Sequence, residues 1–546
     1  MKKYRVIGVV LACVVVANVL VHLRVYRWDL TDDKLYSLSE ASKALLRKTD
    51  APIEVTLLLD GDLNAGFRRL KKATEETVAE MGVYGDVQCT MYDVQRISQD
   101  SLASMGLQPI VIHEREHNGK TVQTTVYPYV LMRYEGKSAV VSLLNNMRGR
   151  SGEENLNASI EQLEYGFMEA LHRLQQTAPS RIAILGGHNE PNRYYTYDLE
   201  ELLSQYFFVD RGSINGEGID LHILDDYKAI IVANPQSGFG EAERFVIDQY
   251  IMRGGSVLWA VDGVRFSDEM LQSDGYTPIT ENELGIKEMF YHYGIQVYPA
   301  LIQDIQCQTS LFNASSDPSQ PNLQPVPWTY APLLQTNPYH PISRNVGTVL
   351  SSFVSPIDAV NVEDSIDKIV LLYTSANTKL TVTPNEVNLN DINPDWDSFN
   401  RSHVPVAVSL EGRFPSTYAH RMIPEGVISD EPICKRGVPA RQVVIGTGSV
   451  LMNEIQQRQP LPMGYDRYSG MLFGNRDFIL NCVLWLTDSD GLLHLREKTV
   501  PLRLLNTKRA YDERSKVELI STICPVAMLL LLGGVIMIIR KRKYEK

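Results

Sequence analysis

The stretch KAIIVANPQSGFGEAERFVIDQYIMRGGSVLWAVDG, residues 228–263, decides the fold of the central part of this chain. Its ends, 229–233 and 256–261, are short continuous apolar runs, and residues 241–252 between them have the spacing of an amphipathic helix. Apolar strands separated by such a helix are typical of a parallel sheet that is covered on both faces. This stretch therefore predicts one strand–helix–strand unit.

The preceding residues extend the same pattern, with a strand at 181–185 and a helix at 197–206. Ligands of parallel sheets bind beyond the carboxyl ends of the strands. The motif GGHNEP, residues 186–191, follows the first strand, and His188, Asn189 and Glu190 are the candidate ligand-binding residues. A turn at an inter-domain contact is the alternative interpretation, and a phosphate loop is excluded because neither GxGxxG nor GxxxxGK[ST] occurs.

Catalytic motifs are missing from this region. An amidotransferase-type hydrolase places a cysteine on a tight turn after a strand, but the chain has no cysteine between Cys89 and Cys307. A G-x-S-x-G elbow for serine chemistry is also lacking. We therefore expect no catalytic residues.

Residues 113–117 spell H-E-x-x-H, the signature of zinc proteases. The signature needs a helix, whereas the β-branched run 110–112, Asn118-Gly119 and the alternating residues 121–126 predict a β-hairpin. On a strand His113 and His117 lie about 13 Å apart, too far to share one zinc ion. We expect no metal site and no cofactor.

Around this core we expect an α/β protein of several parts. Residues 24–150 predict a thioredoxin-like or similar α/β domain, which opens with a helix capped by Ser37 and Glu40. Residues 151–178 predict one long bridging helix, and 179–302 the parallel-sheet domain. The proline-rich segment that follows predicts an irregular and β-rich insertion over 303–440, and a strand and an apolar helix at 441–490 return to the sheet.

Both ends of the chain predict membrane helices. Residues 6–23 and 519–539 are apolar runs flanked by basic tails at 1–5 and 540–546, and residues 491–518 form a polar stalk. By the positive-inside rule both tails are cytoplasmic, so the main body lies on the other side. A cleaved signal peptide and a lipoprotein signal at Cys13 are alternatives for the first run.

Charge and cysteine content narrow the functional classes. The formal net charge is −12, and the tails carry +3 and +4, which leaves −19 for the rest. Such an acidic body predicts no nucleic-acid partner, whereas the basic tails suit membrane lipid. The body cysteines form no CxxC motif, and their pairing stays open: Cys89, Cys307, Cys434 and Cys482.

Several segments, in order from about residue 27 to 506, resemble the GldG family, the membrane-anchored auxiliary components of the gliding-motility ABC transporter of Bacteroidetes. The matching segments are DLTDDKLYSLSEASKALL, GDLNAGFRRLKKAT, IEQLEYGFMEAL, DDYKAIIVANP, VIDQYIMRGGSVLWAVDGV, PISRN, GYDRYSGMLFGNRDFILNCVLWLTD and LRLLN. The resemblance implies a periplasmic body in the inner membrane that works with a separate permease and a separate ATPase. It also implies a glutamine-amidotransferase-like (flavodoxin-like) sheet without catalytic residues. Family members often read G-H-G-E where this chain has residues 187–190, so Asn189 departs from the pattern.

Three functional classes follow from these observations. We favour a noncatalytic transporter subunit. The alternatives are a structural scaffold of the gliding or secretion machinery that binds envelope proteins, and a hydrolase that uses His188 and Glu190.

Overall fold

The computed structural model describes residues 37–488 and 514–544, apart from 62, 92–106, 108, 116–120, 145–151, 177–178, 217, 314–322, 361–364 and 390–394. The chain divides into two compact units, Met1–Thr499 and Val500–Lys546, which are treated separately below. The expected first membrane helix at 6–23 and residues 491–513 of the expected stalk lie outside the described residues.

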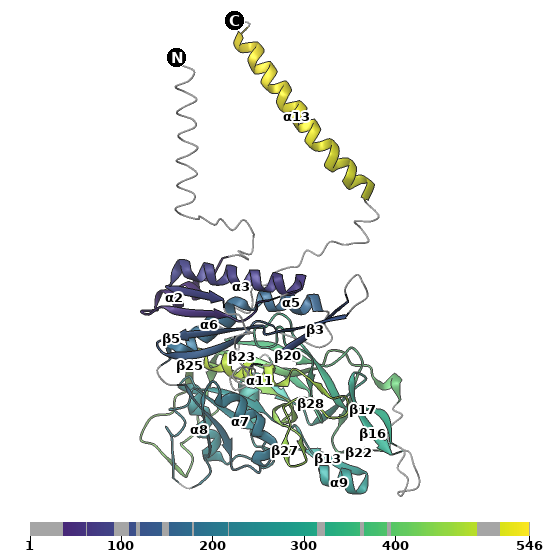
Figure 1. Cartoon of the computed structure of the whole chain (residues 1–546). Coiled ribbons are helices and arrows are strands. Elements are labelled where there is room, and N and C mark those ends of the chain that lie inside the picture. The colour runs from purple at the N-terminus through teal and green to yellow at the C-terminus, as the bar shows by residue number, and fades with distance from the viewer. Residues whose placement is uncertain are drawn as a thin grey trace. The chain divides into compact units, whose positions relative to one another are not determined.

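A ten-stranded sheet is the centre of the first unit (Figure 1). Its main path runs in the order β16-β17-β20-β23-β25-β11-β10-β7-β8, and β18 pairs with β17 beside this path. The strands are β7 Arg181–Gly186, β8 Phe208–Ser213, β10 Ala229–Ala233, β11 Ser256–Ala260, β16 Cys307–Asn313, β17 Leu323–Thr336, β18 Val349–Leu350, β20 Ile366–Tyr373, β23 Pro405–Pro415 and β25 Arg436–Ile445. The five strands from β8 to β25 are parallel to one another, as the sequence predicts for β7, β10 and β11.

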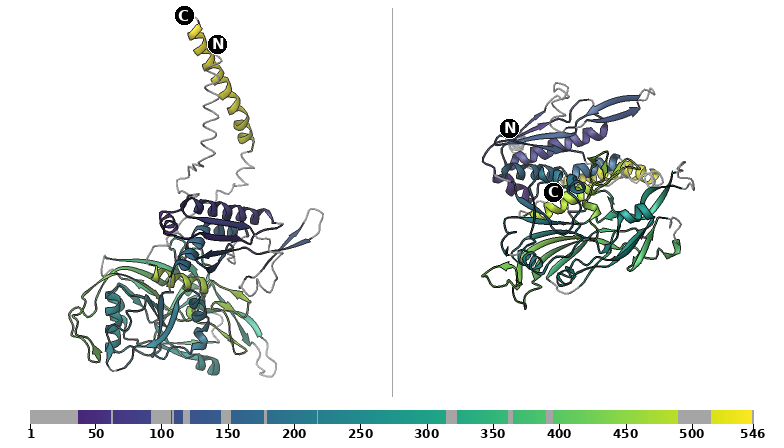
Figure 2. Two further views of the ribbon diagram at one scale, coloured as in Figure 1. Left: turned by 60° about the vertical axis from the view of Figure 1, so that its left-hand side comes forward. Right: turned by 90° about the horizontal axis from the view of Figure 1, so that it is seen from below.

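Helices cover both faces of the parallel half. Alternate strand residues such as Ile231 and Leu258 face α7 (Tyr197–Ser204) and α11 (Asn475–Thr487). Their neighbours Ile230 and Trp259 face α8 (Glu241–Met252) and α10 (Lys287–His292). This alternation is the expected result for strands that are buried on both faces. Helix α11 lies within the segment 441–490, and its buried residues Phe478 and Ile479 pack in the same core as Ile231 and Leu258. Figure 2 shows the ribbon from two further sides.

The other half of the sheet is antiparallel, and most of its strands lie in the segment 303–440, for which the sequence predicts an irregular and β-rich insertion. Residues 323–336 form the long strand β17, although they contain Pro325, Pro327 and Pro332. Pro325 and Pro327 pair with β16 on one side, and among the described strands β17 is paired with β20 only at Gln335 and Thr336. A proline is tolerated in a strand where its missing N–H faces no ladder partner. The prolines therefore lie in the part of β17 that is not paired with β20, and they do not break the strand.

The N-terminal part forms a second sheet in the order β2-β1-β5-β6. The strands are β1 Ile53–Leu57, β2 Val87–Met91, β5 Tyr129–Tyr134 and β6 Lys137–Ser142, and the helices are α2 Glu40–Arg47, α3 Ala65–Tyr84, α5 Gly152–Glu161 and α6 Leu163–Gln175. One face of this sheet packs against α2, α3 and α6, while Glu54 and Arg133 on the other face are exposed. The sheet therefore has a single core.

Two helix predictions in this part are corrected. The cap of α2 is Ser39, whose side chain accepts a hydrogen bond from the Ser42 N–H, because Glu164 of α6 accepts from the Ser39 N–H at 2.7 Å. The expected single helix at 153–176 is divided into α5 and α6 at Gln162. There the N–H of Gln162 is shared between two carbonyl oxygens, three and four residues back, at 3.2 Å each.

The first two residues of the H-E-x-x-H motif, His113 and Glu114, lie on a strand as the hairpin prediction places them, and His117 lies outside the described residues. Strands β3 (Ile110–Arg115) and β4 (Thr121–Val126) are antiparallel, and His113 is opposite Gln123. The residues that join the strands lie outside the described residues. A strand geometry for His113 and Glu114 removes the basis for a zinc-protease site.

Short elements complete the first unit. They are η2 Arg193–Thr196, β9 Ile219–Asp220, β12 Val264–Arg265, α9 Asp268–Asp274, β13 Tyr276–Glu281, β14 Ile295–Val297, β15 Ala300–Asp304, β19 Ile357–Ala359, β21 Thr378–Val382, β22 Asn385–Asn388, η3 Trp396–Ser398, β24 Val427–Ile428, η4 Ser449–Leu451, β26 Ile455–Gln456, β27 Gln459–Pro460, β28 Tyr465–Asp466 and β29 Met471–Leu472. The four body cysteines carry free thiols in this structure.

The second unit contains the helix α13, Arg514–Tyr544. Its segment Ser521–Arg542, 22 residues, is long and apolar enough to cross a membrane by length and composition. This segment overlaps the expected span at 519–539 and supports association of the chain with a membrane.

Candidate functional site

The carboxyl edge of the parallel half has the geometry of a binding site. From β7 the chain goes to β8 on one side and then to β10, β11 and β25 on the other, which is the order 2-1-3-4-5 of flavodoxin-like sheets. Ligands of such sheets bind where the order reverses, here between the loops after β7 and β10. In this chain the two loops are hydrogen-bonded to each other, because the Gln236 and Ser237 N–H groups donate to the His188 carbonyl at 2.8 and 2.9 Å.

The His188 side chain fills this switch point. It is 2% exposed and stacks on the ring of Phe239, with 3.8 Å between ring centroids. Its Nε2 is 3.0 Å from a carboxylate oxygen of Glu243 and its Nδ1 is 3.4 Å from one of Glu190. Burial lowers the pKa of His188, but the hydrogen bonds to Glu190 and Glu243 outweigh it, so the net pKa is raised.

The three residues that the sequence singles out have different environments. Glu190 accepts a hydrogen bond from the His188 N–H at 2.8 Å, and although burial raises its pKa, the contacts with His188 give a net lowering. Asn189 is exposed and has φ = 54°, a left-handed conformation that asparagine tolerates. Gly187 has φ = 108°, and a Cβ there would lie 2.7 Å from Asn215 Nδ2. His188 and Glu190 are therefore together, whereas Asn189 faces outward.

Asp262 is a further residue of this edge that the sequence analysis does not identify. It follows β11, is 5% exposed, and accepts a hydrogen bond from the Gly448 N–H at 2.9 Å. Burial raises the pKa of Asp262 to about 6, against hydrogen bonds from Gly448, Thr447, Asn234 and Gln236 that lower it. The available signal was its position, the first polar residue after the apolar run 256–261.

A cavity of about 380 Å³ lies beside Asp262. It is lined by the end of β11, the segment before and within α10, and β14: Val261, Asp262, Gly263, Asn282, Leu284, Ile286, Lys287, Glu288, Phe290, Tyr291, Gln296 and Val297. Binding pockets for small molecules have volumes from about 300 to 1,000 Å³ and mainly apolar walls. This cavity has the size and lining of such a pocket.

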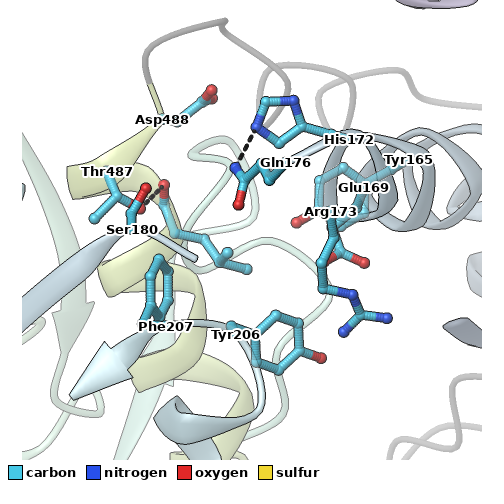
Figure 3. Close-up of a pocket in the computed structure, with 11 residues that line it drawn as sticks. Tyr165, Glu169, His172, Arg173, Gln176, Ser180, Tyr206, Phe207, Thr487 and Asp488 are labelled. Carbon is cyan, nitrogen blue, oxygen red and sulfur yellow. Dashed lines mark hydrogen bonds between the residues drawn. The ribbon is translucent and has the colours of Figure 1, made fainter. Parts of the chain in front are cut away.

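A smaller pocket lies between α6, α11 and the turn before β8 (Figure 3). Its volume is about 70 Å³, enough for a few water molecules. Arg173 lies 5.0 Å from the ring centre of Tyr206, and the Gln176 amide is 2.9 Å from His172 Nε2. Its volume indicates a gap between packed elements, and we assign no ligand to it.

These contacts indicate what the site can do. Both ring nitrogens of His188 face carboxylates of the chain itself, so neither is directed at open space. Within the described residues, no group of three His, Cys, Asp or Glu side chains is placed to hold a metal ion. The switch point therefore has the character of a packed polar core, and the ligand-binding role of His188, Asn189 and Glu190 stays a prediction.

The fold and the site together define an α/β protein with an apolar helix long enough to cross a membrane and a mixed sheet whose parallel half has a switch point closed by internal contacts. A family described as "ABC-type uncharacterized transport system" matches residues 179–482, more than half of the chain. The chain therefore belongs to this family of auxiliary ABC transport components. A second family, a domain of unknown function (DUF7088), matches residues 32–133.

The other comparisons add little. No curated protein matches the chain. Among solved structures, one titled "mmIFT52 N-terminal domain" is similar, with 16% identity and a TM-score of 0.32, over 57% of this chain and 99% of that one.

Proposed function

We propose that this protein is a noncatalytic auxiliary subunit of an ABC transporter that works with a separate permease and a separate cytoplasmic ATPase in gliding motility. The observation that carries the proposal is the family match over residues 179–482, which coincides with the sheet from β7 to α11. The closed switch point supports a noncatalytic role, because both ring nitrogens of His188 face carboxylates of the same chain. The gliding assignment rests on the resemblance in sequence.

The proposed location is the bacterial inner membrane, with both tails in the cytoplasm and the body in the periplasm. The apolar segment of α13 and the basic residues at its end support this orientation. Thiol labelling tests it, because Cys89 is exposed and Cys482 is buried. In cells with a permeabilised outer membrane, a membrane-impermeant maleimide should label Cys89 and spare Cys482. Labelling of Cys89 only after lysis would place the body in the cytoplasm.

The partners are tested by purification from native membranes. After crosslinking, the tagged full chain should co-purify with a polytopic permease and an ATPase in a fixed ratio. A control variant in which residues 521–542 are replaced by an unrelated apolar helix separates contacts of α13 from contacts of the body. Recovery of envelope proteins without permease or ATPase would favour the scaffold alternative and contradict the proposal.

The gliding role has its own test. In a motile source bacterium, deletion of the gene should abolish spreading on agar, and inactivation of the partner ATPase should produce the same defect. Normal spreading of the deletion strain would remove gliding from the proposal and leave the transporter assignment in place.

A further inference from the structure

The cavity beside α10 has walls that are fixed by packing. Leu284, Ile286 and Phe290 are buried, and Phe290 contacts the ring of Trp259 edge to face, with 5.3 Å between centroids. A Cβ at Gly263 would lie 2.6 Å from the Tyr298 carbonyl oxygen, so the backbone at this point is closely packed. The space is therefore a preformed part of the fold.

The charged groups that line the cavity already have partners within the same chain. Lys287 forms an ion pair with Glu281, and Glu288 forms one with Arg421. The Asp262 carboxylate accepts a hydrogen bond from the Gly448 N–H, a group outside the cavity. A charged ligand would have to compete with these contacts or enter without a counter-ion, and burying an unpaired charge is costly.

Two polar side chains on the rim remain for a ligand. Tyr291 is 52% exposed, and Gln296 is exposed as well. Neither side chain forms a hydrogen bond with another of the residues that the structure describes. An aromatic hydroxyl and an amide at the mouth of an apolar space favour a flat apolar body with one polar edge.

We propose that this cavity binds a small neutral aromatic molecule, with its ring against Phe290 and its polar edge toward Tyr291 and Gln296. The apolar walls exclude strongly hydrated ligands, and the paired rim charges select against ions. This site is separate from His188, Asn189 and Glu190, and it does not depend on the transporter assignment.

The test uses the full chain in lipid nanodiscs and a fluoroindole followed by fluorine NMR. We expect saturable line broadening above that of empty nanodiscs. Indoleacetate, an anion, and tryptamine, a cation, should displace the probe at least tenfold less well than indole. Broadening that equals the empty-nanodisc signal, or equal displacement by all three compounds, would overturn the proposal.

Variants locate the binding within the protein. Val297→Trp fills the cavity from its half-buried wall and should abolish the saturable signal. Tyr291→Ala should weaken binding about tenfold without loss of folding, because its side chain is at the surface. The control Tyr339→Ala removes an 88% exposed tyrosine outside the cavity and should bind like the unmodified chain. Unchanged binding by Tyr291→Ala and by a folded Val297→Trp protein would refute the assignment.

Discussion

Three loops begin at the same edge of one sheet, those after β7, β10 and β11. The space in front of the first two is filled by side chains, whereas the space beside the third is open. At the first two loops His188 and Phe239 fill the crevice, with Glu190 and Glu243 around the imidazole. Beside the third loop a cavity of about 380 Å³ is open. In this fold the conspicuous polar motif is used for internal packing, whereas the open space is lined mainly by apolar residues.

The largest effect is expected where the crevice is filled. His188→Ala removes the stack on Phe239 and takes the imidazole away from the buried Glu243 and the half-buried Glu190 carboxylates, so stability should fall by about 3–5 kcal/mol. Urea unfolding followed by tryptophan fluorescence measures this loss. Asn189→Gly is the matched control and should change stability by less than about 0.5 kcal/mol, because glycine accepts φ > 0. If His188→Ala and Glu190→Ala together abolish function in a fully stable protein, the ligand-binding role is supported instead.

The next largest loss of stability is expected from a substitution at the floor of the cavity. Gly263→Ala places a methyl group against the Tyr298 carbonyl oxygen and Ser355 Oγ, so the backbone must move and stability should fall by about 1–3 kcal/mol. The same unfolding measurement applies, and Gly275→Asn, at an open position with φ = 79°, is the control. A stability loss no greater than that of the control would show that the cavity floor is pliable.

Asp262 belongs to both regions, because it lines the cavity and accepts hydrogen bonds from Asn234 and Gln236 in the loop after β10. Its raised pKa makes the stability of the protein depend on pH. Its folded pKa of about 6 lies above the ordinary value of 3.8, so the folded protein binds an extra proton between these values. The contribution of this group to stability is therefore present below pH 4 and is lost as pH rises to about 6, with a slope of up to about 1 kcal/mol per pH unit. Asp262→Asn should remove this part of the slope. An identical pH profile in the variant would contradict the buried, protonated state.

The smallest effect is expected at the mouth of the cavity. Tyr291→Ala should change stability by less than about 0.5 kcal/mol, because the side chain is largely in solvent. Thermal unfolding of the two proteins side by side measures the difference. A stability loss as large as that of His188→Ala would mean that the mouth of the cavity is as tightly packed as the switch point. It would contradict the difference between the two regions.

The sequence predicts well those elements whose patterns are local. β10 and α8 have the predicted bounds because their apolar residues repeat with the period of one structure, without competing signals. The incorrect predictions concern residues whose structure depends on contacts with distant parts of the sequence. Ser39 caps α2 because Glu164, 125 residues away, accepts the hydrogen bond of its N–H. The prolines of β17 are tolerated because they lie in the part of the strand that is not paired with β20.

The same limit applies to the site. The position of His188 at the end of β7 follows from the sequence, but its pairing with Glu243, 55 residues later, does not. Glu243 is also the third residue of a helix, where an acidic side chain has an ordinary role near the N-terminus. The cavity is formed by three segments of unremarkable composition, so no single motif could have indicated it.

The last long strand of the chain lies in the middle of its sheet. β25 joins β11 to β23, and it pairs Gln442 with Val257 across 185 positions of sequence. A fragment that stops before residue 436 would leave two inner strands with unpaired backbone edges, which invite intermolecular pairing. Premature termination before residue 436 should therefore yield an insoluble product, and a shortened working version of this protein has to keep β25.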